Sequence, residues 1–323
     1  MRVKSDWFSS NEIAAVFGSD FELQELEDFF GDVFNLFTED AEGRMLVDVI
    51  NQDWGLFAND ADAYLIINEA AHLSGVNLSS KTTVRYSDAA LVAVNSWKEI
   101  KSELKGNRRF LMDEFIRNKD ENWKWIFTSN DHLSSGDRFF RGRINTERDK
   151  PYIEEKDLTS PPPDKAVSGR ANTYGIPHLY LTDSPETAMY ELRAVTGDQL
   201  TIAEFEITRD IDIIDFTRHE DLYNMYCGEY DSLLQAVQRW ALLKEVSQDM
   251  SRPVRRYDNA NLDYLPTQLV SEYIRVVKGM GGLIFQSSRK GQGKKNIVIF
   301  DKENARMVNS ELRTVGDIEM HFE

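Results

Sequence analysis

The sequence predicts an α+β protein in which a helical N-terminal domain, residues 1–130, precedes a mixed domain, residues 131–323. Apolar residues recur at helical spacing through the first 125 positions. A run of turn-forming residues follows at 128–137, and beyond it short β-type runs are interleaved with helical ones. Strands and helices that do not alternate regularly are typical of α+β folds rather than of a doubly wound sheet.

The N-terminal helices are expected to begin at a capping box formed by Ser9-Ser10-Asn11-Glu12. The apolar stripe that follows at helical spacing consists of Leu23, Leu26, Phe29, Phe30, Val33, Phe34 and Phe37. Further helical segments are expected over residues 61–71, 89–104 and 110–116. An aromatic stripe of this kind is typical of a core rather than of a cofactor-binding segment. We expect this domain to have a regulatory or oligomerising role.

The second domain is expected to contain short strands at residues 138–144, 179–182, 200–207, 283–286 and 296–300. Helices are expected at residues 185–193, 232–246 and 267–277. The first of these helices has a clear start signal, because Ser184 is a favourable N-cap, Pro185 suits the first helical position and Glu186 places an acid in the first turn.

The charge distribution argues against a nucleic-acid partner. The formal net charge is −17, and residues 1–50 carry twelve acids against three bases, which gives −9 of that total. Binding to a phosphate backbone needs clustered lysine and arginine. The acidic N-terminal part is therefore interpreted as a solvated helical face, with an acidic lid over a basic cleft as the alternative.

Cysteine, histidine and hydropathy exclude several other classes. The one cysteine, Cys227, cannot form an intrachain disulfide or a cysteine-rich zinc site. Five histidines are scattered without metal-binding spacing, so no metal is expected. No apolar run is long enough to cross a bilayer, and the N-terminus has no signal-peptide core. We therefore expect a cytoplasmic protein that has no membrane partner.

One short unit of loop, strand and helix carries most of the chemical information. Arg170 follows a loop glycine, Tyr180 lies on the strand, and Glu191 lies about two turns into the helix. A cation, an aromatic ring and a carboxylate suit a substrate that has phosphates, a flat ring and a reacting sugar. Each residue could instead have only a structural role. Arg170 could be a surface arginine, Tyr180 a core tyrosine, and Glu191 an exposed acid paired with a neighbouring arginine.

Two further segments add polar groups. Arg141 and Arg143 alternate on one strand, so both are expected on one face, where they complete a cationic wall or pair with the surplus acids. Ser287 and Ser288 end a strand before the basic loop 289–295, where a hydroxyl could bind a phosphate or ribose. That loop lacks the Walker spacing, and no Gly-x-Ser-x-Gly elbow occurs, so neither an NTPase nor a serine hydrolase is predicted.

Four segments, in this order, resemble the RES family. They are Arg138-Phe139-Phe140-Arg141-Gly142-Arg143, then Gly169-Arg170-Ala171-Asn172, then Tyr180 with Ala188-Met189-Tyr190-Glu191, and finally 282–288 followed by 296–300. The resemblance covers roughly residues 138 to 301. It departs from the family pattern at Ala171, where the family has tryptophan.

The resemblance implies a split-sheet fold similar to that of ADP-ribosyltransferases and a toxin that cleaves the nicotinamide–ribose bond of NAD. ADP-ribose would pass to water or phosphate, in a toxin–antitoxin or phage-defence setting. NAD is then a substrate, and no cofactor is expected. The implied catalytic residues are Glu191, Arg170, Tyr180 and Ser287, with Ser288 as the alternative family serine. The implied NAD-binding residues are Arg141, Arg143, Asn172 and Ser288.

Two alternatives use the same site. One is a protein mono-ADP-ribosyltransferase, and the other is a non-catalytic module that senses NAD or ADP-ribose, suggested by Ala171. The N-terminal extension is similar to HEPN-associated forms, although Arg108, Arg109 and Arg117 have no histidine at the Arg-x-x-x-x-His spacing of HEPN ribonucleases. An antitoxin or immunity protein and a second copy of the chain are the expected protein partners.

Overall fold

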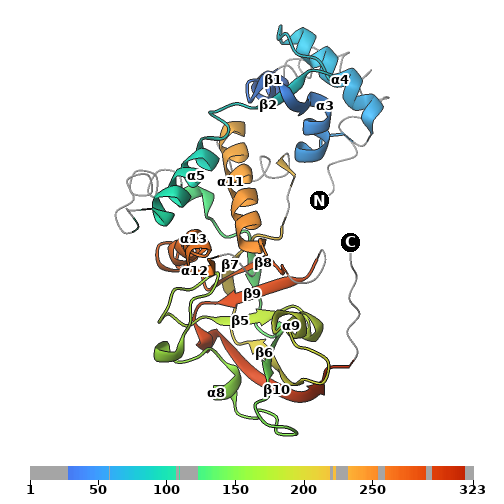
Figure 1. The fold of residues 1–323 in the computed structure, drawn as a ribbon. Coiled ribbons are helices and arrows are strands. Elements are labelled where there is room, and N and C mark those ends of the chain that lie inside the picture. Colours follow the sequence, from blue (N-terminus) through green and yellow to red (C-terminus); the bar gives the residue numbers. More distant parts are fainter. Residues whose placement is uncertain are drawn as a thin grey trace. The chain divides into compact units, whose positions relative to one another are not determined.

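In the computed structural model, the 323-residue chain forms two compact units (Figure 1). The first unit comprises Met1–Trp97 and His219–Leu242, and the second comprises Lys98–Arg218 and Leu243–Glu323. The structure describes residues 28–57, 59–106, 109, 123–218, 221–222, 232–253, 259–288 and 293–316.

The first unit is mostly helical and also contains a small antiparallel sheet. Its elements in chain order are a helix over residues 28–34, β1 (Phe37–Met45), α3 (Leu46–Val49), a π-helical turn (Ile50–Trp54), α4 (Asp60–Leu73), β2 (Thr83–Tyr86) and the first part of α5 (Val92–Lys105). The first part of α11 (Leu233–Ser251) also belongs to it. Strands β1 and β2 pair with each other. Asn59 caps α4, since its side-chain oxygen accepts a hydrogen bond of 2.9 Å from the Asp62 amide.

The apolar stripe of the sequence forms part of the core of this unit. Phe30, Phe34 and Trp54 are fully or almost fully buried there. The helices predicted at 61–71 and 89–104 correspond to α4 and α5. The β1–β2 pair was not predicted, because β1 is a mostly polar and exposed strand without a clear alternating pattern. The predicted capping box, Leu23, Leu26 and the predicted helix at 110–116 lie outside the described residues.

The second unit is built on an eight-stranded sheet with the order β10-β6-β4-β5-β9-β8-β7-β3. The strands are β3 (Asp131–Leu133), β4 (Arg138–Ile144), β5 (Leu179–Thr182), β6 (Gln199–Ile207), β7 (Ile211–Asp215), β8 (Gly282–Gln286), β9 (Lys295–Ile299) and β10 (Ala305–Thr314). Strands β7 and β8 are parallel, and the other described neighbours in this sheet are antiparallel. The predicted α+β class, with a helical N-terminal region and a C-terminal sheet domain, is confirmed.

The sheet opens between two of its central strands. Among the described residues, β4 and β5 share one backbone register pair, Phe140↔Thr182, whereas β4 pairs with β6 along its whole length. The Tyr180 carbonyl accepts a hydrogen bond of 3.1 Å from the Arg141 guanidinium. A side chain therefore occupies part of the space that a second strand–strand hydrogen bond would fill, and this opening lies beside the candidate site.

Short helices surround the sheet (Figure 1). They are α7 (Trp123–Ile126), α8 (Glu155–Leu158), a 3-10 turn (Pro163–Lys165), α9 (Pro185–Glu191), the second part of α11, α12 (Ala260–Asp263), α13 (Leu265–Val276) and a 3-10 turn (Lys302–Asn304). Helix α9 contacts β4, β5 and β6, and its Ala188 packs in one apolar cluster with Leu200 and Ile202. A larger cluster, which includes Phe205 and Ile299, fills the core of the sheet.

The predicted linker at 128–137 is held by hydrogen bonds and is therefore not a free tether. Its residues 131–133 form β3, which pairs with β7. The Asn130 side chain accepts a hydrogen bond from the Asp215 amide (2.8 Å) and donates one to the Asp215 carbonyl (3.2 Å). Strand β3 was not predicted, because its three residues lie among turn-forming residues that are typical of a linker. The predicted domain boundary at residue 130 stays a prediction.

Candidate active site

The loop that carries Arg170 is fixed by two neighbouring polar side chains. The Tyr180 hydroxyl donates to Asn172 Oδ1 (2.7 Å) and accepts from the Ala171 amide (3.0 Å). A Cβ atom on Gly169 would lie 2.6 Å from Asn172 Oδ1 and 2.7 Å from the Tyr180 hydroxyl oxygen. Only glycine fits that close approach, and the loop glycine of the sequence motif therefore has a steric reason.

Helix α9 begins as its sequence predicts. The Ser184 hydroxyl oxygen accepts a hydrogen bond of 3.2 Å from the Thr187 amide, and Pro185 occupies the first turn. Glu191 is the last residue of α9. A Cβ atom on Gly142 would lie 2.7 Å from a methyl group of Leu192, so glycine at this position lets the end of α9 lie close to β4. Glu191 is thereby placed next to the opening in the sheet.

Two buried polar side chains hold the Glu191 carboxylate. The Ser287 hydroxyl donates to Glu191 Oε1 at 2.6 Å, and Asn296 Nδ2 donates to the same oxygen at 2.9 Å. Ser287 directly follows β8 and is 5% exposed, and Asn296 lies on β9 and is 8% exposed. Hydrogen bonds to an ionised carboxylate are stronger than those between neutral groups, so this pair restrains the orientation of the carboxylate.

Glu191 and Asn296 line a cavity of about 370 Å³, which we call the substrate cavity. This volume lies within the range of small-molecule binding sites. The cavity combines one carboxylate with two guanidinium groups and several aromatic rings. Its lining residues are Phe140, Arg141, Gly142, Arg170, Tyr180, Leu181, Thr182, Ala188, Glu191, Leu192, Tyr264, Phe285, Ser288 and Asn296.

The two arginines of the cavity differ in their surroundings. Burial, followed by the nearby charge of Arg143, lowers the pKa of Arg141 to about 10, so Arg141 remains a cation at neutral pH. The Arg170 guanidinium donates to the carbonyls of Asp249 and Arg252 and lies 5.3 Å from the centroid of the Tyr264 ring. The two guanidinium groups therefore bring positive charge to the cavity that Glu191 also lines.

The sequence matches the RES domain over residues 141–322, which is more than half of the chain. The chain belongs to the RES domain family. No curated protein matches the sequence. Among solved structures, this chain is similar to a chain of the M. tuberculosis MbcT–MbcA toxin–antitoxin complex. That similarity has a TM-score of 0.32 and 14% sequence identity, and it covers 57% of this chain and 87% of the other.

The match begins at residue 141. The similarity of the preceding residues to HEPN-associated proteins therefore stays a prediction.

Five of the residues predicted for the site line the substrate cavity of the RES domain: Arg141, Arg170, Tyr180, Glu191 and Ser288. A sixth, Ser287, contacts Glu191 directly. The two adjacent serines therefore have different surroundings, since Ser287 bonds the carboxylate and Ser288 lines the cavity. The roles of all six residues stay predictions.

Arg143 is not among the residues that line the substrate cavity, whereas Arg141 is, and a role of Arg143 in binding NAD stays a prediction. Its guanidinium carbon lies 4.2 Å from the centroid of the Tyr152 ring, and the guanidinium donates to the Asp157 carbonyl. The two arginines are on the same face of β4, but Arg143 lies one side-chain repeat further along the strand. There Tyr152 provides a competing cation–π partner.

Asn172 is not among the residues that line the substrate cavity either, and its role in binding NAD stays a prediction. Its amide nitrogen donates to the carbonyls of Val167 (2.9 Å), Thr173 (3.1 Å) and Ile176 (2.9 Å). Its oxygen accepts from the Tyr180 hydroxyl. An amide side chain with these four bonds organises the loop that presents Arg170.

Sequence reasoning did not identify Asn296 and Tyr264 as parts of the RES-domain cavity. Asn296 was assigned only to a strand, although one polar side chain at the start of an otherwise apolar strand is a usable signal. Tyr264 lies at the start of a segment for which only a structural role beside the cleft was expected. Among the described residues, no group of three or more histidine, cysteine, aspartate and glutamate side chains could hold a metal.

The described helices also include none that is long and apolar enough to span a bilayer.

Buried His178 is expected to make the RES domain less stable in acid. The residue is 5% exposed, and burial, followed by the charge of Arg275, lowers the pKa of its side chain from 6.5 to about 4. An unfolded chain therefore binds a proton that the folded chain rejects as the pH falls from 6.5 towards 4. The free energy of unfolding should fall through this window, by about 3 kcal/mol at most.

Urea unfolding of the wild type and of His178→Leu at pH 4.5 and pH 7 measures this effect. Because every other group titrates in both proteins, the wild type should lose more stability than the variant between the two pH values. Equal losses would show that His178 does not contribute.

Proposed function

We propose that this RES domain cleaves the nicotinamide–ribose bond of NAD and transfers ADP-ribose to water or phosphate. One observation carries the proposal: a carboxylate held by two buried donors faces a cavity that also contains two guanidinium groups. Such a cavity offers a negative charge for a cationic sugar and positive charges for a pyrophosphate. The residues concerned are Glu191, Arg141 and Arg170.

The reaction breaks the bond between the ribose anomeric carbon and the nicotinamide ring nitrogen. The electron pair of this bond leaves with the nitrogen, so nicotinamide departs as a neutral molecule. Positive charge then develops on the anomeric carbon and the ring oxygen of the ribose, as in glycoside hydrolysis. An oxygen of water or phosphate adds to that carbon, and the surplus proton passes to solvent.

Glu191 is the residue proposed to stabilise this developing charge. A carboxylate that is already oriented needs little reorganisation when the cation forms, which is the basis of electrostatic catalysis. Ser287 and Asn296 are proposed as positioning residues, because both donate to the same carboxylate oxygen. Arg170 and Arg141 are proposed to bind the pyrophosphate, and the planar fork of Arg170 suits two phosphate oxygens at once.

For Tyr180, only the aromatic ring and not the hydroxyl is proposed to contact the ligand. Its hydroxyl already bonds Asn172 and Ala171, and burial raises the pKa of the phenol well above its usual range. The hydroxyl therefore remains protonated and is committed to the loop. The ring, which lines the cavity, is proposed to contact the nicotinamide or the ribose.

Two alternatives concern the same cavity. Transfer of ADP-ribose to a protein differs only in the acceptor, and no feature of the described residues favours it. A non-catalytic sensing module rested on Ala171, but this residue is 1% exposed and lies outside the cavity lining. We also propose an antitoxin or immunity partner, since uncontrolled loss of NAD would harm the cell that makes the protein.

Incubation of the purified full-length protein with NAD tests the proposed function. Nicotinamide should be released with or without a metal chelator, and mass spectrometry should identify ADP-ribose or, in phosphate buffer, its phosphate ester. The matched control is the same incubation with the Glu191→Gln protein. NAD that stays intact under all these conditions, with a folded wild-type protein, would contradict the proposal.

A further inference from the structure

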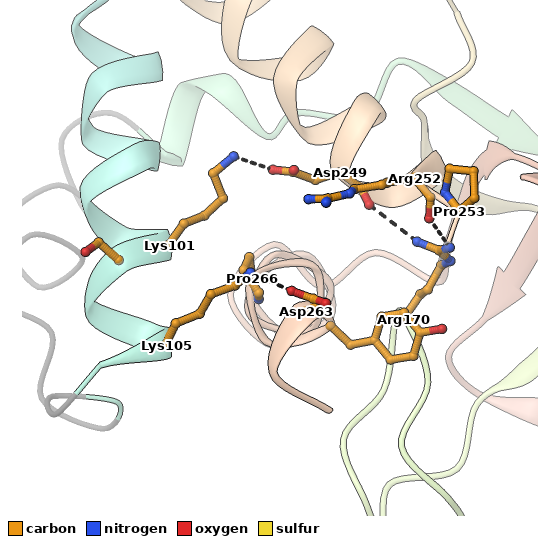
Figure 2. A pocket seen from close by; sticks show the side chains of 10 residues that line it. Lys101, Lys105, Arg170, Asp249, Arg252, Pro253, Asp263 and Pro266 are labelled. Carbon is orange, nitrogen blue, oxygen red and sulfur yellow. Dashed lines mark hydrogen bonds and ion pairs between the residues drawn. The ribbon is translucent and has the colours of Figure 1, made fainter. Parts of the chain in front are cut away.

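A second cavity lies next to the substrate cavity (Figure 2). It measures about 230 Å³, and we call it the α5 pocket because α5 provides one wall. It is lined by Lys101, Ser102, Lys105, Arg170, Asp249, Arg252, Pro253, Asp263, Tyr264 and Pro266. Arg170 and Tyr264 line both cavities, so the two are neighbours that share a wall. All the lining residues belong to the second unit.

The α5 pocket is rich in cations although the chain is strongly acidic. Lys101, Lys105, Arg170 and Arg252 face two acids, Asp249 and Asp263, which leaves a formal charge of +2 in a chain whose net charge is −17. Four cations around one small cavity create a positive local potential that attracts anions. Their positions follow from the helix, since Lys101 and Lys105 are four residues apart and lie on one face of α5.

Each of the two lysines in the pocket is paired with an aspartate. Lys101 Nζ lies 2.9 Å from Asp249 Oδ2, and Lys105 Nζ lies 2.7 Å from Asp263 Oδ1. All four side chains retain contact with solvent. An ammonium group has three donors, so an aspartate oxygen and an anion oxygen can be bound together. Figure 2 shows both lysines extending from α5 towards these two aspartates.

The arginines complete the pocket from the opposite side. The Arg170 guanidinium reaches the carbonyls of Asp249 and Arg252, where Figure 2 shows it near the end of α11. A guanidinium carries five N–H donors in a planar fork. The exposed Arg252 side chain provides a second planar fork. Guanidinium and ammonium groups around one cavity can bind several oxygens of a tetrahedral phosphate at once.

We propose that the α5 pocket binds a phosphate group beside the proposed NAD site. The phosphate is either a monoester carried by a dinucleotide in the substrate cavity or free inorganic phosphate that serves as acceptor. This proposal rests on the proposed function in one respect, namely that the neighbouring substrate cavity binds a dinucleotide. Lys101 and Lys105 precede the matched residues 141–322, so this pocket extends the domain with cations from outside the family match.

Direct binding to the full-length Glu191→Gln protein, which should not turn over its ligands, tests the proposal. Isothermal titration would measure inorganic phosphate, NAD and NADP, whose extra 2′-phosphate is the monoester probe. The test variants add either Lys101→Gln with Lys105→Gln, or Arg252→Ala. The matched control adds Lys98→Ala, an exposed lysine on α5 outside the pocket. Thermal unfolding would verify that each variant is folded.

The expected result is a loss of about tenfold or more in affinity for inorganic phosphate or for NADP in both test variants. The Lys98→Ala control should keep the affinities of its parent. Loss of NADP binding without loss of NAD binding would identify a monoester on the substrate. Loss of inorganic phosphate binding, together with faster nicotinamide release by the wild type in phosphate, would identify the acceptor.

Unchanged affinities for both ligands in folded variants would overturn the proposal. An equal loss in the Lys98→Ala control would do the same, since it would show a general effect of charge. These readouts do not depend on turnover. If the wild type left NAD intact but bound phosphate through the α5 pocket, the proposed function would fail while the phosphate site remained.

Discussion

Replacement of Glu191 by glutamine should lower the rate of nicotinamide release from NAD by about a thousandfold, which corresponds to roughly 4 kcal/mol of transition-state stabilisation. Glutamine has nearly the same shape, and its side-chain oxygen can still accept from Ser287 and Asn296. The fold should therefore persist. What is lost is the negative charge that opposes the cationic ribose, so kcat should fall far more than the affinity for NAD.

The measurement is steady-state release of nicotinamide together with a thermal unfolding curve for each protein. Glu186→Gln is the matched control, because Glu186 is an exposed acid in the first turn of the same helix. That control should keep the wild-type rate. A folded Glu191→Gln protein with wild-type turnover would remove the carboxylate from the mechanism.

Replacement of Arg170 by alanine should raise the KM for NAD by about 10- to 100-fold, with a much smaller change in kcat. A bond to a phosphate is made both in the bound substrate and in the transition state, so its loss weakens binding uniformly. The variant also loses the contacts of Arg170 with Tyr264 and with the carbonyls of Asp249 and Arg252. A lower midpoint of thermal unfolding should accompany the change in KM.

Two comparisons separate binding from stability in this experiment. Lys165→Ala removes an exposed cation from the segment before the loop and should leave the KM unchanged. Arg170→Lys retains the charge but not the planar fork, so its KM should lie between those of the wild type and the alanine variant. A fall in kcat at constant KM would instead place Arg170 at the reacting carbon.

The parts of the fold that could be read from the sequence are those with local signals. The predicted strands at 138–144 and 179–182 coincide with β4 and β5, and the start of α9 was indicated by its cap and proline. Strand β10 was missed because it lies at one edge of the sheet and most of its residues are exposed, which leaves no apolar alternation. Edge strands owe their structure to a neighbour, and local sequence does not record that neighbour.

The same distinction applies to the candidate site. Arg170, Tyr180 and Glu191 belong to one short unit, so local sequence could place them together. The contact of Ser287 with Glu191 spans 96 positions, and that of Asn296 spans 105. For Arg143, strand alternation gives the face of the side chain but not its aromatic partner, Tyr152. Long-range pairing, rather than local propensity, decides these positions.

The candidate site forms only when strand β9 pairs in the correct register. Asn296 lies opposite Thr182 of β5 and opposite Phe285 of β8, so pairing on both sides fixes its direction. A slip of one residue would turn its amide to the other side of the sheet. Pairing between strands distant in sequence is slow compared with helix formation, so we expect the Glu191 carboxylate to acquire Asn296 as a partner only after helix α9 has formed. A chain that is still folding therefore has no assembled candidate site.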